Sequence, residues 1–112
     1  MRIMATLLQE METERASQAE CLRSTVREQL RAALRDILPG VSVTVFGSLT
    51  RAGHFSESSD VDIALAVEPA HMSIYQLIAQ LSERLARRVD VILLPECRFR
   101  DKILREGETW TP

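Results

Sequence analysis

The sequence has few of the features that mark secreted proteins, membrane proteins or proteins with cysteine-based metal sites. Its two cysteines, Cys21 and Cys97, are far apart in the 112 residues, so their spacing predicts neither a disulfide framework nor a C-x-x-C metal site. No run of about 18 apolar residues is present, and the first residues lack the apolar region and cleavage site of a signal peptide. A net charge of −2 gives no general attraction for nucleic acid. We therefore expect a cytoplasmic protein with reduced thiols, no membrane contact and no direct nucleic-acid binding.

The residues that are present describe an ordinary globular protein. Hydrophobic residues make up 46% of the chain and charged residues 27%, with only four glycines and four prolines, which is typical of a folded domain. A chain of this length forms one hydrophobic core rather than two. We expect a single domain over residues 1–112, in which residues 1–38 form an N-terminal helical segment.

The helical pattern is strongest from Ser17 onward. The letters S-Q-A-E that begin there form a capping-box pattern, and apolar residues then recur at helical spacing until Pro39-Gly40 ends the helix. Upstream, a shorter apolar stripe is interrupted by charged residues at 12–15. The segment 1–38 is therefore either one long helix, projecting from the domain at its start, or two helices.

The same segment carries arginines at intervals of four, which places them in one row along a helix. They are Arg23, Arg27, Arg31 and Arg35. We expect this row to be a solvated face that neighbouring acids partly neutralise, and a contact surface for an acidic partner is the alternative.

Three apolar segments rich in β-branched residues are predicted as strands, at residues 41–46, 61–67 and 89–94. Helices are predicted at residues 48–52, 72–88 and 98–106, and a loop at residues 53–59. Trp110, the only tryptophan, follows in the tail and is expected to cover one edge of the sheet. This order predicts an α/β (α+β) fold, a small mixed sheet of three or more strands with helices packed mainly on one face.

Residues 43–67 contain the motifs that suggest a chemistry. Gly47-Ser48 leaves the first strand, and the first amides of the short helix that follows could bind phosphate. Asp60 and Asp62 open the second strand and point to the same face, which makes a hard oxygen site that suits Mg²⁺. Each pattern alone is weak, because D-x-D often lies on a solvent face and Gly-Ser is a common turn.

A third acid, Asp90, stands in the apolar strand V-D-V-I-L-L. An unpaired carboxylate inside a core is costly, so Asp90 lies either at the exposed start of its strand or beside the metal ions of Asp60 and Asp62. We favour the second arrangement, because a cation makes clustered carboxylates tolerable. A phosphate turn, two paired carboxylates and a third acid are together the parts that nucleotidyl transfer requires.

The letters F-G-S-L-T-R, then S-D-V-D-I-A-L-A-V and R-V-D-V-I-L-L, resemble the DNA polymerase β-like nucleotidyltransferase superfamily. Within it the sequence looks most like the minimal nucleotidyltransferases (MNT), the antitoxin halves of MNT/HEPN toxin–antitoxin pairs. It departs from the usual signature in two ways. Eleven residues rather than ten separate Gly47-Ser48 from Asp60, and T-R-A-G stands where A-R-G is usual.

The resemblance implies a role for each matching residue. Gly47 and Ser48 would hold the β- and γ-phosphates of a nucleoside triphosphate, with Arg51 as a further phosphate contact. The three acids would ligate two Mg²⁺ ions, as catalytic and metal-binding residues. They are Asp60, Asp62 and Asp90.

The function that the resemblance implies is Mg²⁺-dependent transfer of AMP from ATP to a hydroxyl, expected to be a tyrosine, of a HEPN ribonuclease toxin held in a heteromeric complex. The alternative is an inactive module of the same fold that inhibits its partner toxin by binding alone. A transferase acting on a small molecule is a third, less favoured interpretation.

Overall fold

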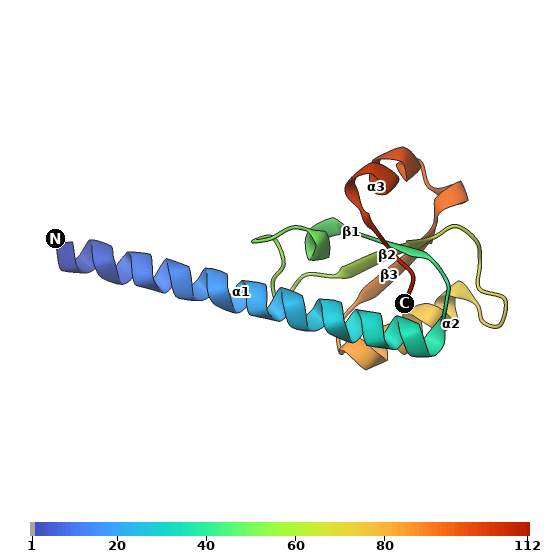
Figure 1. The fold of residues 1–112 in the computed structure, drawn as a ribbon, viewed down its shortest axis with the longest axis horizontal. Helices are drawn as coiled ribbons and strands as arrows, with labels where there is room; N and C mark the ends of the chain where they lie inside the picture. The colour runs from blue at the N-terminus through green and yellow to red at the C-terminus, as the bar shows by residue number, and fades with distance from the viewer. Residues whose placement is uncertain (1) are drawn as a thin grey trace.

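The computed structural model describes the backbone of residues 2–112 and the side chains from residue 6 onward. A four-stranded sheet lies at its centre, with helices around it (Figure 1). The elements in order are α1 (Arg2–Ile37), β1 (Val43–Phe46), the 3-10 helix η1 (Gly47–Thr50), β2 (Val61–Leu65), α2 (Ile74–Leu85), β3 (Val89–Leu93), the 3-10 helix η2 (Leu94–Glu96), α3 (Arg100–Glu106) and β4 (Glu108–Trp110). The predicted α/β (α+β) fold is confirmed, with element ends shifted by a few residues.

Helix α1 is a single element of 36 residues. Its first half extends away from the rest of the molecule, which measures 61 Å along its longest axis (Figure 1). In this projecting half, Leu7, Leu8 and Met11 are between 47% and 57% exposed. The capping-box pattern at Ser17 does not begin a helix, because the residues before it are good helix formers and the helix runs through. No helix among the described residues is both long and apolar enough to cross a membrane.

The sheet is mixed, as predicted, with the strand order β3-β2-β1-β4. β2 and β3 are parallel and are connected through α2, whereas β1 runs antiparallel to both β2 and β4. The sequence does not predict β4, because three residues are too few to show an alternating pattern. Trp110, expected at an edge of the sheet, is a buried residue of this edge strand.

Two helices cover one face of the sheet and a third lies on the other. α1 and α2 pack with Val61 and Ile63 in the main hydrophobic core. α3 lies on the opposite face (Figure 1), where Ile103 belongs to a smaller cluster with Ala64. Because side chains alternate along a strand, Asp62 lies on the face that carries α3.

The arginine row of α1 meets β4. The guanidinium of Arg27 donates two hydrogen bonds of 2.8 Å to the carboxylate of Glu108. Arg27 and Arg31 also lie over the ring of Trp110, at 5.1 and 4.4 Å from its centroid. Arg35 is exposed. The expectation of a solvated face is therefore wrong for the arginines that contact β4, because a strand unseen in the sequence covers them.

The Arg27–Glu108 pair should stabilise the fold in a pH-dependent way. Its hydrogen bonds lower the pKa of Glu108, so its contribution is present above the ordinary glutamate pKa and is lost as the pH falls through the lowered one. Glu108→Gln should reduce the free energy of unfolding by about 1 kcal/mol at neutral pH. Urea unfolding at several pH values measures the loss, with Glu28→Gln, an exposed acid on α1, as the control. An equal loss in both variants would contradict the prediction.

Candidate active site

The parallel pairing of β2 and β3 sets two carboxylates side by side. In the register of these strands Asp62 lies opposite Asp90, and on its other side Asp62 lies opposite Phe46, the last residue of β1. Asp60 immediately precedes β2 and, two residues from Asp62, falls on the same face of the chain. The structure thus brings the three predicted acids to the end of the sheet where β1 leads into η1.

The three acids form a patch of negative charge that is partly buried. Burial raises the pKa of Asp62, and the charges of Asp90 and Asp60 raise it further, while the charge of Arg88 opposes the shift. A carboxylate whose ionised form is disfavoured in this way gains strongly from a nearby cation.

Arg88 lies between two of the acids. Its Nε is 3.3 Å from Oδ1 of Asp90 and 3.9 Å from Oδ2 of Asp60. The side chain is 73% exposed, so these ion pairs contribute little to stability and the guanidinium can leave at small cost. Sequence reasoning assigns Arg88 only to the end of a helix and misses this contact. The sequence signal for this contact is an arginine two residues before Asp90.

Gly47 lets the turn after β1 lie against Asp62. Its φ is +78°, in the left-handed region, and a Cβ there would lie 2.6 Å from Oδ2 of Asp62. The predicted short helix at residues 48–52 is the four-residue η1, in which Ser48 is partly buried. Among the described side chains none caps the start of η1, so its first amides have no side-chain acceptor.

Arg51, the expected phosphate contact, turns toward α3. Its Nη2 is 3.5 Å from Oε2 of Glu106, and both side chains are exposed. A pocket of about 320 Å³ lies between η1 and α3, with Gly47 on one side and Phe99 and Lys102 on the other. Arg51 therefore stands beside the turn and forms only a weak, exposed ion pair with α3.

Two residues that sequence reasoning overlooks order the loop before Asp60. Phe55 is buried in the main core, and Arg87 lies over its ring at 4.8 Å from the centroid. Arg87 also donates to the main-chain carbonyls of Ser56 and Ser59, at 3.4 and 2.9 Å. Residues 53–59 form a loop, as predicted. The lone aromatic residue in this polar stretch is the sequence signal that part of the loop is buried.

The three acids have the ligand atoms that Mg²⁺ prefers, but their side chains are not arranged to hold an ion. Carboxylate oxygens are ligands that Mg²⁺ prefers, and a cation would relieve the repulsion that Asp62 experiences from its neighbours. In the part of the chain that the structure describes, no group of three or more acidic, histidine or cysteine side chains is arranged to hold a metal ion. Binding by Asp60, Asp62 and Asp90 would therefore require the carboxylates to draw together and Arg88 to move away.

Comparisons with known proteins agree on the fold. A protein-family model described as "Polymerase beta, Nucleotidyltransferase" matches residues 28–110. One solved structure, of a toxin–antitoxin with AMP-PNP, is 24% identical, with a TM-score of 0.58 over 76% of this chain and 73% of that one. Another, of the toxin–antitoxin MntA-HepT, is 20% identical, with a TM-score of 0.50 over 83% and 73%. At these identities the structures show a shared fold. The comparison with curated proteins gave no match.

Asp62→Asn should stabilise the metal-free protein at neutral pH, because it removes a disfavoured charge and keeps the side-chain shape. Since the pKa of Asp62 is raised, the cost develops as the pH rises from the ordinary aspartate pKa through the raised one, and it is absent below. We expect a midpoint of thermal unfolding a few degrees higher in chelator, and added Mg²⁺ should stabilise the wild type more than the variant. Asp101→Asn, which changes an exposed acid of α3, is the control. A destabilised Asp62→Asn at neutral pH contradicts this expectation.

Gly47→Ala should destabilise the protein more than Gly40→Ala. Both glycines have left-handed φ values, +78° and +74°, so both variants carry a similar backbone strain of about 1 kcal/mol. Only at Gly47 would the new Cβ displace Asp62, since at Gly40 it meets no described atom within 4 Å. The urea midpoints of the two variants are compared. Equal losses of stability would mean that the Asp62 side chain moves aside without cost.

Proposed function

Because the chain belongs to the polymerase beta nucleotidyltransferase family, which it matches over residues 28–110, we propose that it is an antitoxin that transfers AMP from ATP to a hydroxyl of a partner toxin and thereby neutralises it. The observation that carries the proposal is the register of β2 and β3, which sets Asp62 beside Asp90 at the turn that follows Gly47. A toxin is proposed as the partner because the fold resembles those in two toxin–antitoxin structures.

The acids are proposed to hold two Mg²⁺ ions. Bound there, the ions would supply a lower pKa for the attacking hydroxyl and stabilisation for the departing pyrophosphate. In the transfer, the acceptor oxygen bonds to the α-phosphorus, and the bond from that phosphorus to the β-phosphate's bridging oxygen breaks. Asp90 is proposed to help remove the hydroxyl proton, and Asp60 and Asp62 would hold the ions.

The triphosphate is proposed to lie at η1. Among the described side chains none caps the start of η1, and free main-chain amides favour negative charge. The hydroxyl of Ser48 is proposed to add a further contact to the phosphates. Arg51 would have to exchange its exposed partner Glu106 for a phosphate, which costs little because both side chains are solvated.

The acceptor is proposed to be a tyrosine of a HEPN-type toxin in a heteromeric complex.

A second function, inhibition by binding alone, is favoured by two observations. The acids are not arranged to hold a metal among the described residues, and the projecting half of α1 exposes Leu7, Leu8 and Met11 to a partner.

Intact mass spectrometry of the partner separates the two functions. The protein is incubated with ATP, Mg²⁺ and the product of the neighbouring gene as the candidate toxin, and that partner is then weighed. We expect an AMP adduct with the wild type and a loss of transfer of at least about 100-fold in Asp60→Asn, because each acid is needed for two-metal catalysis.

Asp101→Asn provides the matched control, because it makes the same change at a 93% exposed acid of α3. It should leave the adduct in place. A toxin that is neutralised without an adduct, equally by the wild type and Asp60→Asn, would overturn the enzymatic proposal and support inhibition by binding.

A further inference from the structure

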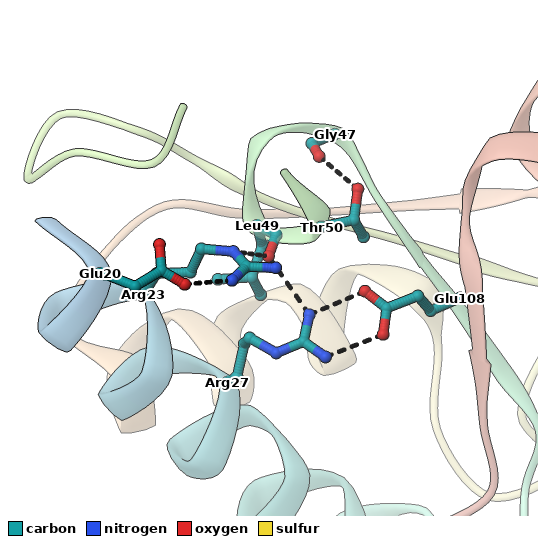
Figure 2. Close-up of polar contacts among 7 residues, drawn as sticks. All are labelled: Glu20, Arg23, Arg27, Gly47, Leu49, Thr50 and Glu108. Atoms are coloured by element: carbon teal, nitrogen blue, oxygen red, sulfur yellow. Dashed lines mark hydrogen bonds and ion pairs between the residues drawn. The ribbon is translucent and has the colours of Figure 1, made fainter. Parts of the chain in front are cut away.

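We propose that Arg23, supported by Arg27, is a positioning residue that holds η1 in place from helix α1. The inference rests on the proposed function, because η1 is the turn assigned there to the triphosphate. Figure 2 shows the contacts. Nε of Arg23 donates to the main-chain carbonyl of Leu49 at 2.8 Å, and Nη1 of Arg27 donates to the same oxygen at 3.3 Å.

These bonds complete the hydrogen bonding of a turn that is too short to be stable alone. The carbonyl of Gly47 accepts from Oγ1 of Thr50 at 2.8 Å, and the carbonyl of Ser48 accepts from the amide of Arg51 at 3.1 Å. The carbonyl of Leu49 is the next along the chain, and the two arginines of α1 supply its donors. With the carbonyls held on one side, the direction of the amides at the start of η1 is fixed on the other.

The surroundings of the two guanidinium groups favour this role over direct phosphate binding. Arg23 donates to the carboxylate of Glu20 and Arg27 to that of Glu108, so each positive charge already has an acidic partner (Figure 2). Their side chains are only 16% and 20% exposed, and the side chain of Leu49 is fully buried. Groups that are neutralised and covered in this way hold a neighbouring carbonyl more readily than they move to a ligand.

A turn that is already ordered binds its ligand without a further loss of conformational freedom. The same benefit applies to bound ATP and to the transition state, so it changes the affinity for ATP more than the chemical step. Loss of the contact should therefore raise KM for ATP and leave kcat nearly unchanged.

The test compares Arg23→Met with Arg35→Met. Both remove one positive charge from the same helix row, but Arg35 is exposed and lies three turns further along α1. Hydrogen exchange at the amide of Arg51, which donates to the carbonyl of Ser48, reports the order of the turn without any ligand. In Arg23→Met we expect a larger increase of exchange there than in the strands of the sheet, KM for ATP raised about tenfold, and kcat within about twofold. Arg35→Met should change none of these.

Arg23→Lys keeps the charge and most of the side-chain stem but lacks the planar fork that reaches Leu49 and Glu20 together. It should give an intermediate effect, and it replaces Arg23→Met in the comparison if that variant does not fold. Unchanged exchange in the turn, or an equal rise of KM in Arg35→Met, overturns the positioning role. Faster exchange in Arg23→Met combined with a wild type that neither binds ATP nor transfers AMP leaves the positioning role intact and rejects the proposed function.

Discussion

The pairing of β2 with β3 places two like charges next to each other. Asp62 and Asp90 are opposite each other in parallel strands. Burial and their mutual repulsion disfavour the charged form of Asp62, and the charge of Arg88 offsets this only in part. Helix α2 connects these two strands. Its start is fixed by a capping box between Ser73 and Gln76, and its end by Ala86 in the left-handed region, at a φ of 51°. A shift of β3 by one residue would turn Asp90 into the main hydrophobic core.

The turn after β1 brings together parts of the chain that are remote in sequence. Asp62 of β2 lies against Gly47, while Arg23 of α1 holds the carbonyl of Leu49. Glu108 of β4 in turn holds Arg27 of the same helix. A four-residue turn with little stability of its own is thus fixed from both sides, by the sheet and by the long helix.

Local patterns in the sequence carry much of this structure. The alternation of V-D-I-A-L predicts both the strand and the shared face of Asp60 and Asp62, and the cost of an isolated carboxylate in an apolar strand predicts that Asp90 lies near them. Contacts between distant segments leave no such pattern. Nothing near Arg23 or Arg27 in the sequence indicates Leu49 or Glu108, because these contacts join α1 to a turn and a strand that lie far from it in the sequence. For the same reason the contacts of Arg87 with the carbonyls of Ser56 and Ser59 are visible only in three dimensions.

The projecting half of α1 has a practical consequence for measuring assemblies. The radius of gyration is 16.7 Å, whereas a compact chain of this length has one of about 13 Å. In gel filtration, which separates by hydrodynamic size, such a rod-bearing protein elutes ahead of a sphere of equal mass. Elution volume alone would therefore overstate how many copies are present, with or without a toxin. Light scattering, which gives mass independently of shape, is the suitable way to establish stoichiometry.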